Sequence, residues 1–170
     1  RQFQQEAFFE YHLYSLDGRT TVKQNQTKQI GLLSAAGIPI KKELRYYGAS
    51  QYYRSQWGTP VSNQKVGVFL EIANREQDRL GVPLHQGTVR VYKASADRSL
   101  QFIGEDTIDH TPKDEKVKIK MGEAFDVVGE RTQRDWRKVA WGVYETEWEI
   151  QLRNHKKEDV QVTILEPVPG

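Results

Sequence analysis

The stretch YETEWEIQLR, residues 144–153, alternates apolar and polar side chains with a period of two. Tyr144, Trp148, Ile150 and Leu152 fall on even positions, while glutamate, glutamine and arginine fill the odd positions. This period is typical of a β-strand with one face in a core and the other in water. After a polar turn at 154–159, alternation resumes with valine and isoleucine at 160, 162 and 164, which predicts a hairpin whose two arms bury the same face.

Alternation of the same kind recurs along the whole chain and predicts most of its other elements. Helical signals are confined to two short turns, one at 74–81 and one at 122–126. Further strands are expected at 8–16, 38–46, 66–72 and 117–121, and a hairpin over 88–108 with its loop at 94–99. The sequence therefore predicts an all-β module of roughly ten short strands with little helix, either a barrel or, as we prefer, an antiparallel two-sheet β-sandwich.

Charged residues on the predicted strands suggest how some of them are placed. Lysines at 116, 118 and 120 share one strand face, and glutamates at 145, 147 and 149 share another. Because opposite charges on neighbouring strands attract, we hypothesise that these two rows lie close together. The polar stretch 129–138 is interpreted as an edge strand or a protruding hairpin arm, where charge prevents unwanted strand addition.

Length and composition limit the classes of protein that fit. The chain has 170 residues, which suits a single module over 1–170, and its net charge of +2 does not indicate nucleic-acid binding. The absence of cysteine excludes disulfides and thiolate metal sites. No apolar run is long enough for a transmembrane helix, so membrane insertion is not expected. Because the chain starts at Arg1 rather than methionine, we expect a fragment of a longer multidomain protein.

A set of short phrases in fixed order carries a family resemblance that covers the chain from about residue 8 onwards. The phrases are YHLY (11–14), NQTKQ (25–29), NQKVGV (63–68), LGVPL (80–84), GTVRVY (87–92), GED and IDHTP (104–112), AFDVV (124–128) and LRNHK (152–156). Together they resemble the C-terminal domain of unknown function in bacterial mucoidy-inhibitor-A-like proteins. The resemblance implies a β-rich module in a periplasmic or exported parent, and it brings no established activity. The chain departs from the family's turns at 17–19 and 85–86.

The most unusual local composition is a run of aromatic residues between positions 46 and 57. Rings on a loop can stack on sugars or on a partner's side chains, because tyrosine and tryptophan combine a large contact area with few rotatable bonds. The alternative is that these rings close one end of the core. The candidate binding residues are Tyr46, Tyr47, Tyr52, Tyr53, Trp57 and Arg54.

An acidic group near a histidine is the second candidate site. Asp106, Asp109 and His110 could act as acid and base in a hydrolase if geometry brings them together. The neighbouring acids at 105, 114 and 115 match no calcium loop, and lysines lie among them, which favours a solvated loop. The four histidines are too dispersed for zinc spacing, so no metal or cofactor is predicted.

The absence of catalytic motifs and the regular alternation lead to one preferred function. We expect a non-catalytic interaction or scaffold module of a bacterial envelope protein, binding a protein partner or the remaining domains of its parent. A glycan-binding module using the aromatic segment and a hydrolase at Asp106 remain alternatives. Unpaired sheet edges could also join two copies in a homodimer.

Overall fold

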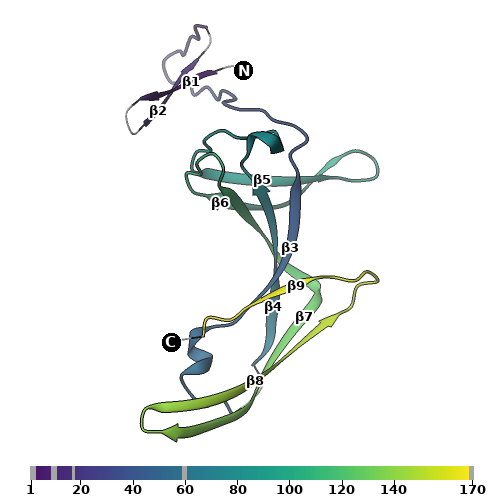
Figure 1. Cartoon of the computed structure of the whole chain (residues 1–170). Coiled ribbons are helices and arrows are strands. Elements are labelled where there is room, and N and C mark those ends of the chain that lie inside the picture. The colour runs from purple at the N-terminus through teal and green to yellow at the C-terminus, as the bar shows by residue number, and fades with distance from the viewer. Residues whose placement is uncertain (1–2, 9–10, 17, 59–60, 169–170) are drawn as a thin grey trace. The chain divides into compact units, whose positions relative to one another are not determined.

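The computed structural model describes residues 3–8, 11–16, 18–58 and 61–168, and the chain divides into two compact units, Arg1–Ile38 and Pro39–Gly170. The described residues are mostly β and contain no α-helix, which confirms the predicted all-β character (Figure 1). The first unit contains an antiparallel hairpin of β1 (Phe3–Phe8) and β2 (Tyr11–Leu16). Of the strand predicted over 8–16, residues 11–16 form β2 and Phe8 ends β1, while residues 9–10 lie outside the described residues.

A five-stranded sheet with the order β8-β7-β4-β3-β9 forms most of the second unit (Figure 1). Its strands are β3 (Ile40–Tyr47), β4 (Val61–Ala73), β7 (Lys116–Ala140), β8 (Val143–Asn154) and β9 (Val162–Leu165). Strand β7 is long enough to pair with β4 through its first part and with β8 through its second part. All pairs are antiparallel except β3 with β9, which is parallel.

The predicted hairpin over 88–108 is confirmed as the pair β5 (Gly87–Ala94) and β6 (Leu100–Ile108). A hydrogen bond joins β6 to the main sheet, since the Asp106 carboxylate accepts from the backbone N–H of Lys120 at 2.6 Å. This bond ties the hairpin to the start of β7.

Asn74, which follows β4, holds the turns next to that hairpin in place. Its side-chain amide donates to the carbonyls of Val82 and Pro112 at 2.7 and 2.8 Å, and its oxygen accepts from the N–H of Gly81 at 3.1 Å. The side chain is fully buried. The predicted turn at 74–81 is present as the 3₁₀ turn η2 (Glu76–Asp78).

The core of the second unit lies inside a curl of the five-stranded sheet. Leu44, Tyr46, Val66 and Val127 are buried together, and residues of β8 and of the segment at 160–162 pack against them. Because β8 and β9 are opposite edges of the sheet yet contact one cluster, the sheet must bend around it. The observed arrangement is this curled sheet and the β5–β6 hairpin. Roughly ten strands in two facing sheets are not confirmed.

Two local predictions are wrong. Residues 122–126 form part of β7 and not a helical turn, because Gly122 has a positive φ and lets the strand pass through an irregularity without breaking. Strand β9 pairs with β3 and not with β8, whose hairpin partner is β7. Alternation shows which side chains share one face of a strand, but it does not show which strand lies next.

The hypothesis that the lysine row meets the glutamate row is also wrong. Lys116 and Lys118 form ion pairs with Glu71 of β4, at 2.8 and 3.3 Å. The glutamates of β8 are opposite the far half of β7, where Glu145 pairs with Arg137 at 2.7 Å. The great length of β7 separates the two rows, and each row has partners of its own.

Candidate functional site

The structure distributes the six aromatic-segment candidates between the interior and the surface. Tyr46 in β3 and Tyr52 in the 3₁₀ turn η1 (Ser50–Tyr53) are buried, and Tyr53 and Trp57 are half-buried. Tyr47 and Arg54 are exposed.

The rings on η1 and the loop after it pack against Trp148 of β8, a residue that the sequence analysis treated only as part of a strand face. The centroid of Tyr52 lies 5.1 Å from that of Trp57 and 5.6 Å from that of Trp148, with ring planes inclined at 74° and 48°. The ring planes of Tyr53 and Trp148 are inclined at 65°, with their centroids 6.4 Å apart. Rings inclined in this way offer no common flat surface for stacking a sugar.

Arg131 of β7 lies at the centre of this aromatic group with 0% of its surface exposed. Its guanidinium carbon is 5.6 Å from the ring centroid of Tyr46, 5.0 Å from that of Tyr52 and 5.8 Å from that of Trp148. Each distance is within the range of a cation–π attraction, which strengthens when the cation is removed from water. The rings therefore form the walls of a pocket around a buried cation, which we name the Arg131 pocket.

Glu166, one residue beyond β9, neutralises this cation. Both of its carboxylate oxygens accept from the Arg131 guanidinium, one of them at 2.9 Å, and one also accepts from the Tyr53 hydroxyl. Burial on its own would lower the pKa of Arg131, but the hydrogen bonds and charge of Glu166 outweigh burial and raise that pKa. Burial and the bond to Glu166 both raise the pKa of the Tyr53 hydroxyl.

The amide of Gln64 links two walls of the pocket. Its oxygen accepts from the Tyr46 hydroxyl, and its NH₂ donates to the Tyr52 hydroxyl. Burial is the main reason that the pKa of Tyr46 is raised, so this hydroxyl stays protonated and able to donate. The tyrosines are thereby fixed by hydrogen bonds as well as by packing.

Two glycines leave the space that the pocket needs. A Cβ at Gly129 would overlap the ring of Tyr46, and a Cβ at Gly48 would overlap the carboxylate of Glu166. Neither position is marked by its sequence context, and the need for glycine appears only when β3, β7 and Glu166 are brought together.

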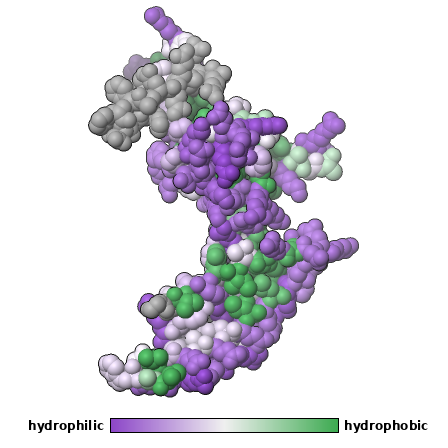
Figure 2. All heavy atoms as spheres, in the orientation of Figure 1, coloured by the Kyte–Doolittle hydropathy of each residue, from purple (hydrophilic) through white to green (hydrophobic). Residues whose placement is uncertain are grey.

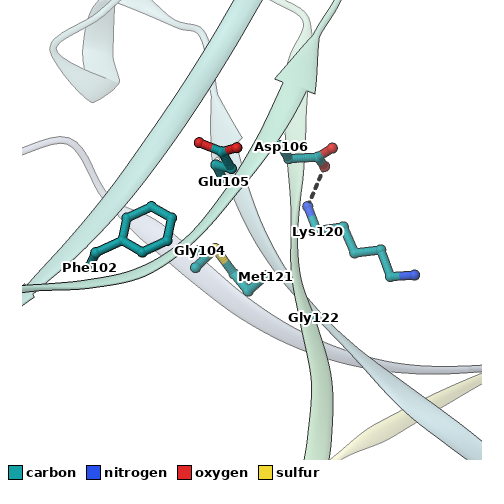
Figure 3. A pocket seen from close by; sticks show the side chains of 7 residues that line it. All are labelled: Phe102, Gly104, Glu105, Asp106, Lys120, Met121 and Gly122. Carbon is teal, nitrogen blue, oxygen red and sulfur yellow. Dashed lines mark hydrogen bonds between the residues drawn. The ribbon is translucent and has the colours of Figure 1, made fainter.

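The acidic candidates lie apart from this pocket, and the contacts of the described residues spread them. Asp106 and Glu105 line a shallow hollow of about 560 Å³ between β6 and β7 (Figure 3). Asp106 accepts from backbone N–H groups, and Glu105 pairs with Arg90 at 3.0 Å. His110 accepts from the N–H of Gln86 at 3.3 Å. Among the described residues, neither Asp106 nor Asp109 is hydrogen-bonded to His110.

The far parts of β7 and β8 form a two-stranded arm. Among the described residues, pairing of β7 with β4 extends as far as Arg131, while pairing with β8 continues to Ala140 and Val143. The predicted hairpin arm over 129–138 is thus confirmed for the part beyond Arg131. Trp136 and Tyr144 stack on one face, with centroids 5.2 Å apart and planes inclined by 21°.

The end of this arm is apolar and open to water. We name the exposed apolar residues at this end the arm tip. Figure 2 shows green, apolar residues beside paler ones at this end of β7 and β8. Trp141 in the turn is 92% exposed. The arm tip consists of Val139, Trp141, Val143 and Tyr144, all of them exposed.

Comparison with known proteins gives no relative: no family model, no curated protein and no solved structure matches this chain. Within the described ranges, no group of three or more histidine, aspartate or glutamate side chains is arranged to hold a metal ion. No helix in that part of the chain has the length and apolar character needed to cross a membrane.

Proposed function

We propose that the second unit is a non-catalytic interaction module that docks the arm tip into an apolar groove of a partner protein. The observation that carries the proposal is the exposure of four large apolar side chains at the end of a two-stranded arm. Large apolar side chains exposed together at the end of an arm are a liability in a monomer and are typical of an interaction site. Aromatic residues at its centre supply most of the energy in such contacts.

The core of the unit supports the same proposal. Among the side chains whose burial the structure describes, the buried apolar ones are Leu44, Tyr46, Tyr52, Val66, Val117, Ile119 and Val127. Many other large apolar residues stay exposed, so apolar area remains available for association.

The setting of the module rests on the sequence phrases. We propose that it belongs to a mucoidy-inhibitor-A-like parent and acts in the periplasm or as part of an exported protein. We propose that other parts of this parent complete an arrangement of two facing sheets.

Substitution at the arm tip tests the proposal against a matched control. Trp141→Ser should abolish co-purification of the partner that a photo-crosslinker at position 139 identifies. Phe125→Ser removes an apolar side chain that is 95% exposed in another part of β7, and it should leave co-purification unchanged. Equal loss in both variants, or retention in both, would refute docking through the tip. Binding of the tip to lipid vesicles or glycans in place of a protein would also overturn it.

A further inference from the structure

The structure points to a second interaction surface, which is distinct from the arm tip. We propose that the edge of β3 and the Arg131 pocket together form a receptor for an extended segment carrying a carboxylate. In this structure the receptor binds the chain's own β9 and Glu166. We propose that it also binds the same segment, β9 with Glu166, from a second copy of the chain.

Strand β9 is bound as an added strand. Its ladder with β3 is parallel and runs over four residue pairs, from Leu44 with Val162 to Tyr47 with Leu165. One further bond extends the contact, because the N–H of Gly48 donates to the carbonyl of Leu165 at 2.8 Å. A ladder of main-chain bonds gives affinity for any extended segment, so selectivity has to come from side chains.

The Arg131 pocket supplies that selectivity one residue past the ladder. Arg131 reaches the Glu166 carboxylate with two N–H groups, a planar arrangement that fits a carboxylate better than an amide or a hydroxyl. A segment with an uncharged residue here would leave a fully buried guanidinium without a counter-charge. The missing Cβ of Gly48 leaves space for the carboxylate. The receptor therefore fits an extended chain with an acidic residue directly after the ladder.

The connection before β9 allows this segment to be exchanged between copies. Residues 155–161 join β8 to β9. Beyond a bond from the His155 N–H to the Asp126 carbonyl of β7 at 2.8 Å, their hydrogen bonds are local: Lys156 N–H to the Asn154 side chain at 3.0 Å, and the Asn154 amide to the Glu158 carbonyl at 2.8 Å. Since every contact of β9 within one chain is also available between two chains, exchange changes only this connection. A segment tethered in the same chain has the higher effective concentration. Exchange therefore becomes measurable when the ion pair between the chain's own Glu166 and Arg131 is weakened.

A labelled peptide tests the receptor in the full chain. The probe is a fluorescent peptide of residues 160–168, and the proteins are the wild type, Glu166→Gln and the control Glu158→Gln. We expect the peptide to bind the Glu166→Gln protein at least tenfold more tightly than the wild type, whose own segment competes. The same peptide with glutamine at 166 should bind at least tenfold more weakly, and Glu158→Gln should match the wild type.

Two results would overturn the receptor, each obtained with a Glu166→Gln protein whose circular dichroism spectrum matches the wild type. Either the peptide does not bind, or the peptides with glutamate and with glutamine at 166 bind equally well. Exchange is tested by mixing Glu166→Gln, which keeps the receptor, with Arg131→Met, which keeps the acidic segment. A 1:1 dimer in light scattering supports exchange, and monomers only would refute it even if the peptide binds. Should Arg131→Met fail to fold, dimerisation of Glu166→Gln with added wild type decides the question. Trp141→Ser should not alter peptide binding, so this test fails independently of the arm-tip proposal.

Discussion

Replacement of Glu166 by glutamine tests the physical basis of the Arg131 pocket. The change removes one negative charge with little change in shape, and it leaves a guanidinium with 0% exposure without its counter-ion. Breaking a buried ion pair from one side costs about 3 to 5 kcal/mol. Because the Glu166 side chain is 21% exposed and water reaches it in part, we expect a loss near the lower end, about 3 kcal/mol. This is a large share of the stability of a typical domain.

Urea unfolding followed by tryptophan fluorescence measures this loss, since the ring of Trp148 lies over the guanidinium. Glu158→Gln is the matched control, because that side chain is 74% exposed and its removal should change the free energy of unfolding by less than about 0.5 kcal/mol. Adding Arg131→Met to Glu166→Gln removes the stranded charge, so the double variant should be more stable than the sum of the single losses implies. A loss below about 1 kcal/mol for Glu166→Gln, or strict additivity in the double variant, would refute the reasoning.

Three further predictions concern other parts of the second unit. Asn74→Ala removes a fully buried amide and leaves the Val82 and Pro112 carbonyls and the N–H groups of Gly81 and Val82 without this partner, so it should lower the free energy of unfolding by about 2 to 4 kcal/mol in thermal melts; a loss under about 1 kcal/mol would contradict this. Gly129→Ala should cost about 1 to 3 kcal/mol because its Cβ overlaps Tyr46, whereas Gly58→Ala, which meets nothing nearby, should be neutral in the same urea titrations. Hydrogen bonds from Arg45 and Lys41 lower the pKa of Glu43 to about 2, so the carboxylate stabilises the fold above the unfolded pKa near 4.5, and this stabilisation is lost as the pH falls towards 2. Glu43→Gln should reduce the loss of unfolding free energy between about pH 5 and pH 2 by about 1 to 2 kcal/mol, and an unchanged loss would refute this prediction.

Much of the secondary structure could be predicted from alternation alone. The β5–β6 hairpin, β3, β4 and β8 all lie where the period of two placed strands. The pairing of β9 could not be predicted in this way, because a strand with the same buried face can pair with any neighbour that presents a free edge.

The candidate site was predictable only in part. The aromatic run drew attention to Tyr46 and Tyr52, which do form walls of the Arg131 pocket. Arg131 and Glu166 were missed, because a charged residue in a polar stretch has no local mark of burial. The register of β7 against β8 is what reveals the position of Arg131. Arg131 is opposite Ile150, an inward-facing residue of β8, so its side chain lies on the core face.

The sequence by itself determined that the chain is built of strands and which side chains of a strand share one face, because both properties follow from the period of two along a few neighbouring residues. Whether such a face is buried was decided by the tertiary structure: Tyr144, on a predicted core face, is 52% exposed. Only the tertiary structure decided that β7 extends past β4 into an arm and that β9 crosses to β3. It also decided that Glu166 meets Arg131, 35 positions away in the chain. Such contacts join segments whose local sequences carry no information about each other, so they exist only once the sheet has curled around its core.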